Sequence, residues 1–138
     1  MSKLALRDGD DYPEAAGKHL VDGTVLARAE RHDGAGYLAG YAVECTIKTL
    51  IQLERGKPRK YKHRLTRLGQ NAMRFAALPG ARSARYAPQA IAGAAGWGEE
   101  LRYRAPGAIS GATAQEWLQE ARMLYEATIV PMRLDGVI

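Results

Sequence analysis

The longest apolar pattern in the chain runs from Tyr37 to Ile51 (YLAGYAVECTIKTLI). Its apolar residues recur at the three- and four-residue spacing of a helix, and they cover most of the helix surface instead of one stripe. A helix of this kind belongs in the middle of a bundle or at a subunit interface. We predict a helix over residues 34–54, with Asp33 as its N-cap and a stop at residues 56–58.

Gly36 and Gly40, four residues apart, lie on this predicted helix. Because glycine has no side chain, we expect the pair to let another backbone come close. Cys45 lies among the apolar residues of the same helix. We interpret it as a small buried hydrophobic residue. It is the one cysteine of the chain, so an internal disulfide and a multi-cysteine metal site are both excluded.

Helical spacing also predicts elements on both sides of this central helix. We expect a first helix over residues 12–32, a third over 65–78, and a helix over 81–96 that is broken at Pro88. The last helix would open at Thr113, with Glu116 completing a capping box, and would kink or end at Pro131. Residues 97–107 read as a structured loop.

No segment alternates apolar and polar residues over strand length, so the pattern predicts an all-α fold. We expect an antiparallel up-and-down bundle of four to five helices joined by short turns. The chain of 138 residues suits a single domain over 1–138, in which residues 1–11 form a flexible arm. No run reaches the roughly 20 apolar residues of a membrane helix, and residues 1–19 lack a signal-peptide core. We therefore expect a cytoplasmic protein.

Charge is distributed unevenly along the sequence. Residues 55–98 hold ten basic and no acidic residues, a net charge of +10, whereas the rest of the chain has a net charge of −5. This asymmetry favours a polyanionic partner such as RNA or a nucleotide phosphate. The alternative is a solvated basic face that lies against acidic helices of the same protein.

Two groups of polar residues are candidates for a ligand site. Glu44 and Lys48 share a helix face at a spacing of four; they either order the bundle as a buried pair or line a ligand site. The members of the second group are Trp97, Arg102, Tyr103 and Arg104. Their rings can stack on a base and their guanidinium groups can hold phosphate. The alternative is that the group plugs the end of the bundle, with Arg102 paired to an acid such as Glu44.

The connector before the third helix interleaves basic residues with an aromatic residue, as RNA-contacting loops do. It would supply a nucleic-acid surface or simply be a solvated loop. Its basic members are Arg59, Lys60, Lys62 and Arg64. His63 of the same connector is a weak catalytic candidate. The spacing of the three histidines does not support a metal site, although folding could bring two of them together. We expect no cofactor and no metal.

The segment A-G-Y-L-A-G-Y-A-V-E-C-T-I-K, residues 35–48, is preceded by a helix with His19 and followed by K-H-R-L at 62–65. In these features the chain resembles the HEPN-domain family, in its stand-alone prokaryotic branch, over residues 12–133. The resemblance implies a bundle of four or five helices that is often a homodimer. It also implies work with nucleotides or RNA, in some members as a metal-independent ribonuclease toxin beside a nucleotidyltransferase antitoxin.

The family's ribonuclease signature is an Arg followed by four to six residues and a His near the start of a late helix. Here His63 follows Arg59 after three residues, and no later histidine exists to serve Arg102 or Arg104. We therefore predict a non-catalytic module that binds nucleotide or RNA. Two alternatives stay open: the protein-interaction half of a toxin–antitoxin pair, and a divergent ribonuclease in which His63 meets Arg102 in space.

Overall fold

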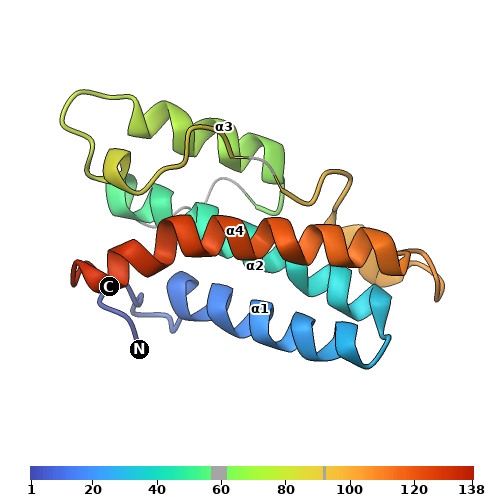
Figure 1. Ribbon diagram of the computed structural model, residues 1–138. Coiled ribbons are helices and arrows are strands. Elements are labelled where there is room, and N and C mark those ends of the chain that lie inside the picture. Colours follow the sequence, from blue (N-terminus) through green and yellow to red (C-terminus); the bar gives the residue numbers. More distant parts are fainter. Residues whose placement is uncertain (57–61, 92) are drawn as a thin grey trace.

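A computed structural model describes residues 1–56, 62–91 and 93–138 of the chain (Figure 1). Four α-helices and two 3-10 helices occur in these ranges, and no β-strand does, which confirms the all-α prediction. The elements are α1 (Tyr12–Arg28), α2 (His32–Arg55), α3 (Leu65–Ala76), η1 (Arg82–Arg85), η2 (Glu99–Tyr103) and α4 (Gly111–Leu134).

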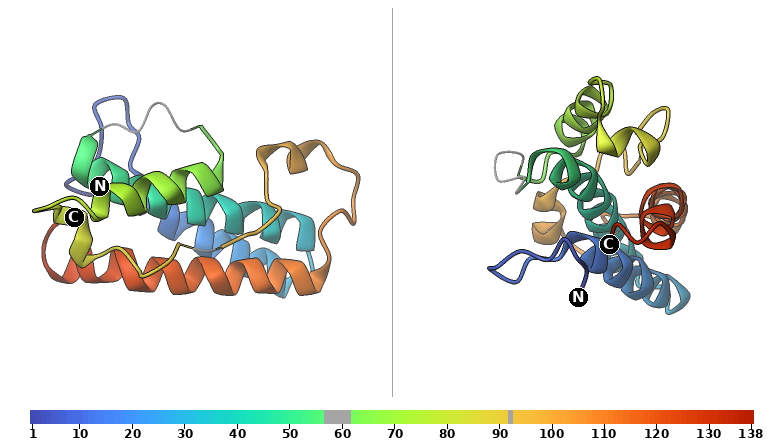
Figure 2. Two further views of the ribbon diagram at one scale, coloured as in Figure 1. Left: turned by 90° about the horizontal axis from the view of Figure 1, so that it is seen from above. Right: turned by 90° about the vertical axis from the view of Figure 1, so that its left-hand side faces the viewer.

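Helix α2 forms the centre of the bundle, as its apolar sequence predicts. Helices α1, α3 and α4 all pack against it (Figure 2). Ile47, Leu50 and Ile51 of α2 are almost fully buried, and burial of each such side chain stabilises the fold by about 1.5–3 kcal/mol. Cys45 is buried too, and burial raises the pKa of its thiol to about 12. The interpretation of this cysteine as a hydrophobic core residue is therefore confirmed.

The two glycines of α2 admit side chains instead of another backbone. A methyl group on Gly36 would come within 2.8 Å of Ile109, and one on Gly40 would overlap the indole ring of Trp97. Both neighbours come from the segment that precedes α4. The predicted approach of another backbone is therefore wrong in detail: the space at these glycines is filled by side chains, mainly of the segment that precedes α4.

Helix α1 runs antiparallel to α4 as well as to α2 (Figure 1). Glu14 in the first turn of α1 forms an ion pair of 2.9 Å with Arg133 in the last turn of α4. Further along both helices, Gly17 lies against the ring of Tyr125. Helix α1 is therefore joined to the far end of α4 by a side-chain ion pair.

Helices α2, α3 and α4 run in the same direction, so the up-and-down alternation does not extend past the first pair (Figure 1). At one end of the bundle, the Arg55 guanidinium that ends α2 lies 4.8 Å from the ring centre of Phe75 near the end of α3. At the other end, Asp33 in the first turn of α2 contacts Ile109 just before α4. Up-and-down bundles need short turns, whereas residues 77–110 lead the chain back along the bundle before α4 begins.

The N-terminal caps of α2 and α4 differ from the predicted ones. Helix α2 begins at His32, and the Asp33 carboxylate accepts hydrogen bonds from the backbone N–H groups of Gly107 and Ile109 instead of capping its own helix. These two hydrogen bonds hold the pKa of Asp33 below its ordinary value. Helix α4 is capped by Ser110, whose Oγ accepts from the Thr113 N–H, so the predicted cap lies three residues too late.

Two further boundaries also differ from the prediction. Pro131 lies inside α4, which continues to Leu134, because proline removes only the hydrogen bond of its own missing N–H while its carbonyl still accepts from the Asp135 N–H. In place of a helix over 81–96 broken at Pro88, the structure has only the 3-10 helix η1, in a segment rich in alanine and glycine. Alanine favours a helix locally, but this segment has too few large apolar residues to hold one against the bundle.

The segment ahead of α1, which we expected to be a flexible arm, makes several hydrogen bonds. The Ser2 hydroxyl donates to the Asp11 carboxylate over 2.6 Å, and the Lys3 ammonium donates to the Gly136 carbonyl over 2.6 Å. Buried Gln52 of α2 donates to the Leu4 carbonyl over 2.7 Å. Within the described ranges, none of the helices combines the length and apolar character needed to cross a membrane.

Candidate functional site

Glu44 and Lys48 form a buried ion pair on α2. Their charged atoms lie 2.5 Å apart, and the exposed fractions of the side chains are 3% for Glu44 and 12% for Lys48. The Lys48 ammonium also lies 5.4 Å from the ring centre of Tyr12 on α1. The pair therefore joins helices inside the bundle, which agrees with the ordering role and not with a ligand site that opens to solvent.

The same carboxylate also holds His63, a contact that the sequence did not predict. His63 Nδ1 lies 2.9 Å and 3.1 Å from the two oxygens of Glu44. On the other side of the ring, Nε2 lies 3.1 Å from a carboxylate oxygen of Glu99, at the start of η2. His63 thus bridges the centre of α2 to a loop that lies 36 positions further along the sequence than the histidine itself. No spacing rule links these three positions, because each lies on a different element.

Trp97, for which the sequence allows either stacking on a ligand or a place in the bundle, is part of the core. The side chain is buried, and its Nε1–H donates to the Tyr37 carbonyl over 3.0 Å. Its ring packs edge-on against Tyr41, with the ring centres 5.0 Å apart. The Tyr41 ring in turn contacts His63 edge-on and His19 at a tilt. Burial raises the pKa of Tyr41 and lowers the pKa of His19, so both groups favour their neutral forms.

The other three residues of the loop cluster lie at the surface. The Arg102 guanidinium lies 4.8 Å from the ring centre of Tyr103, and both side chains are exposed. Interactions with Tyr103 and then Tyr37 raise the pKa of Arg102. Arg102 therefore does not pair with Glu44, whose partners are Lys48 and His63. Arg104, one residue past η2, is exposed as well. The six predicted ligand-binding residues consequently do not form one site.

The basic connector lies only partly within the described residues. Arg59 and Lys60 fall outside them. Lys62 and Arg64 are exposed, and Lys62 has a left-handed backbone conformation with φ of 39°. Among the described residues, no group of three or more histidine, cysteine, aspartate and glutamate side chains is arranged to hold a metal ion.

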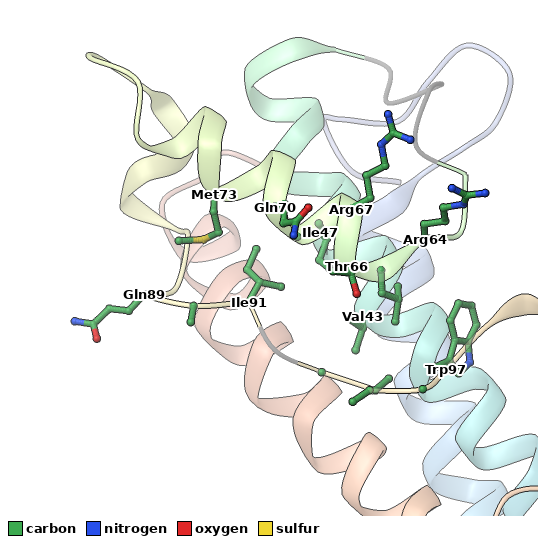
Figure 3. Close-up of a pocket in the computed structure, with 17 residues that line it drawn as sticks. Val43, Ile47, Arg64, Thr66, Arg67, Gln70, Met73, Gln89, Ile91 and Trp97 are labelled. Atoms are coloured by element: carbon green, nitrogen blue, oxygen red, sulfur yellow. The ribbon is translucent and has the colours of Figure 1, made fainter.

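An open groove of about 1180 Å³ lies between α3 and residues that include Gln89, Ile91 and Trp97 (Figure 3). Val43 and Ile47 of α2 form part of its apolar floor, and Trp97 lies toward one end. Arg64 and Arg67 line the same groove where α3 begins. None of the described residues that line it is acidic. The described polar and charged side chains along it are Arg64, Thr66, Arg67, Gln70 and Gln89.

Two carboxylates of the bundle bind the backbone of the segment 77–110. Glu54 of α2 accepts a short hydrogen bond from the backbone N–H of Ser83, and Glu120 of α4 accepts one of 2.6 Å from that of Ala94. Each acid therefore anchors this segment to the bundle. Neither acid is among the described residues that line the groove.

No family model, curated protein sequence or solved structure matches this chain.

Proposed function

We propose that the protein binds a nucleotide or single-stranded RNA, without cutting it, in the groove between α3 and residues 89–97. The observation that carries the proposal is the lining of this groove. It combines an apolar floor with two arginines and has no acidic residue among its described members. Such a groove attracts phosphate and repels no part of a polyanion.

Each part of a nucleotide finds a matching surface in the groove. Arg64 and Arg67 line the groove, and their guanidinium groups, which point away from residues 89–97 in Figure 3, would bind phosphate oxygens at its rim. Gln70 of α3 carries an amide group that can donate to and accept from the edge of a base. The floor around Val43 and Ile47 would receive the face of the base. The volume of about 1180 Å³ exceeds the range of about 300–1000 Å³ that is typical of small-molecule pockets. We infer that the groove has room for more than one nucleotide.

The surroundings of His63 favour binding over cleavage. A general base needs a ring nitrogen that can reach the substrate proton. Here one nitrogen of His63 faces Glu44 and the other faces Glu99. Among the described contacts, none joins His63 to Arg102 or to another arginine, which supports binding over cleavage. A divergent ribonuclease would need an arginine beside His63 in addition to the release of Glu99 from the ring.

The test is fluorescence anisotropy of a labelled single-stranded RNA titrated with the protein at two salt concentrations. The double variant Arg64→Ala, Arg67→Ala should weaken binding by at least about tenfold, because each arginine contributes about 1 kcal/mol or more. Its affinity should also depend less steeply on salt, since fewer phosphates are contacted.

The matched control is the double variant Arg74→Ala, Arg82→Ala. Arg74 and Arg82 are exposed and do not line the groove, yet their removal changes the net charge by the same amount. We expect this control to change the affinity by less than about threefold. Equal losses in both double variants would show that the affinity comes from net charge, and the groove would then not be the site.

A second surface supports the expected homodimer. Val21 and Val25 of α1 and Val130 of α4 are exposed around a shallow groove between these two helices. The same groove carries Arg28 and Arg122 together with Glu126. A twofold interface must be complementary to itself, and a face with both charge signs around an apolar centre meets that requirement.

The double variant Val21→Glu, Val25→Glu tests this dimer by sedimentation. It should be monomeric at concentrations where the wild-type chain is dimeric. A monomeric wild-type chain would refute the dimer and leave the face for a different protein. Co-purification with a small nucleotidyltransferase encoded by a neighbouring gene would then favour the toxin–antitoxin alternative.

A further inference from the structure

His63 is held on both sides by groups that only accept hydrogen bonds. The distances are 2.9 Å from Nδ1 to Glu44 and 3.1 Å from Nε2 to Glu99. Glu44 also accepts from Lys48, so its carboxylate is paired as an anion. A neutral imidazole has one N–H, whereas the doubly protonated ring has two. A ring that donates to both carboxylates at once therefore uses both of its N–H groups.

The two carboxylates differ in how firmly they are held. The side chain of Glu44 is 3% exposed, lies in the middle of α2, and has Lys48 as a second partner. The side chain of Glu99 is 42% exposed and begins a short 3-10 helix. Exposed ion pairs contribute about 0–1 kcal/mol, so the Glu99 contact can exchange with another anion at little cost. The contact with Glu44 fixes the ring orientation, and the contact with Glu99 is the replaceable one.

His63 and Glu99 are close in sequence to residues that line the proposed binding groove. Arg64, the residue after His63, lines that groove, as does Trp97, which lies two residues before Glu99. Among the described residues, the groups that contact the ring are Glu44 and Tyr41 from α2 and Glu99 from η2. An anion at the position of the Glu99 carboxylate would meet the Nε2–H of His63 close to Arg64.

We propose that His63 forms a phosphate seat at the end of the groove, and that Glu99 fills this seat in the absence of ligand. A phosphate of the bound nucleotide or RNA displaces the carboxylate and accepts from His63 Nε2–H. Glu99 then acts as an internal competitor that lowers the affinity of the free protein for phosphate. This inference rests on the proposed function, because it names one contact and one regulatory residue of the same site.

Substitutions at Glu99 and Glu100 distinguish competition at His63 from a simple change in net charge. Glu99→Gln removes the competing anion, and Glu100→Gln removes the same charge from the next residue of η2, which does not contact His63. In the RNA anisotropy assay, Glu99→Gln should bind about three- to fivefold more tightly than Glu100→Gln, the ratio that loss of an exposed ion pair allows. Equal affinities of the two variants would overturn the proposal.

The dependence on His63 is tested by a double-mutant cycle. In a His63→Gln background, Glu99→Gln should no longer improve binding, because the donor that phosphate would gain is absent. An undiminished improvement would show that Glu99 acts through something other than His63. Circular dichroism and thermal unfolding establish that the His63→Gln chain is folded before its affinity is interpreted.

Nitrogen NMR of histidine-labelled protein, with inorganic phosphate as the probe, needs neither RNA nor the His63→Gln chain. In Glu99→Gln, phosphate should shift His63 Nε2 more than Nδ1, which stays against Glu44. An unmoved Nε2 at saturating phosphate would refute the seat. A shift of Nε2 without RNA binding would retain the seat and refute the proposed function. If RNA binding needs Arg64 and Arg67 but Nε2 does not shift, the seat is refuted and the proposed function is retained.

Discussion

Gly40→Ala tests the closest packing in the structure, the contact between α2 and the loop that carries Trp97. A methyl group at this position would overlap three atoms of the indole, Cε2, Nε1 and Cδ2. These atoms belong to a rigid ring, so no flexible chain end can swing aside. Since carbon atoms pack at about 3.5–4.0 Å, the whole ring would have to withdraw by more than about 1 Å.

The cost of this withdrawal can be worked from the contacts that the ring makes. Overpacking in a core costs about 1–3 kcal/mol. Loss of the hydrogen bond from Trp97 Nε1 to the Tyr37 carbonyl adds about 1 kcal/mol. The higher helix propensity of alanine offsets about 1 kcal/mol. We therefore expect Gly40→Ala to lower the free energy of unfolding by about 2 kcal/mol.

Urea unfolding followed by tryptophan fluorescence measures this effect. With a typical slope of about 1–3 kcal/mol per molar urea, the midpoint should fall by about 1 M. Gly69→Ala is the matched control, because Gly69 lies inside α3 and a methyl group there would only make ordinary contact with Ile91 at 3.4 Å. The control should raise stability by about 0.5–1 kcal/mol. A Gly40→Ala chain as stable as wild type would refute the packing of Trp97 against α2.

Three further predictions concern the core and one helix cap. Glu44→Gln should lower the free energy of unfolding by about 3 kcal/mol, because it leaves the Lys48 charge buried without its partner; a loss below 1 kcal/mol in urea unfolding would contradict the buried pair. Because burial raises the pKa of Cys45 to about 12, only about one thiol in ten thousand is ionised at pH 8. A thiol reagent should therefore label the native chain at least about a thousandfold more slowly than the urea-unfolded chain, and a ratio below tenfold would show an accessible thiol. Ser110→Ala should cost about 1 kcal/mol of stability and Thr113→Ala less, since Ser110 is the observed cap of α4; the opposite order would restore Thr113 as the cap.

Local patterns in the sequence predicted the four α-helices and the central place of one of them, but they also predicted a helix over 81–96 that the structure does not show. The spacing of apolar residues predicted α2 to within two residues at its start and one at its end, because a helix that is apolar on most of its surface has no stable place except the core. The same kind of signal predicted α3, which ends two residues earlier than expected, and the burial of Cys45. These properties depend on residues three or four positions apart, which helix geometry places on the same face.

The tertiary structure alone decided the direction of α3 and α4 and the contacts of the candidate site. Trp97 reads as a stacking residue in the sequence, and its burial depends on Gly40, 57 positions earlier. The carboxylates of Glu44 and Glu99 reach His63 from two other elements. Which side chain meets which across elements depends on how the long segment 77–110 returns along the bundle. No local spacing encodes that path, because it follows from the sum of many weak packing contacts in the folded chain.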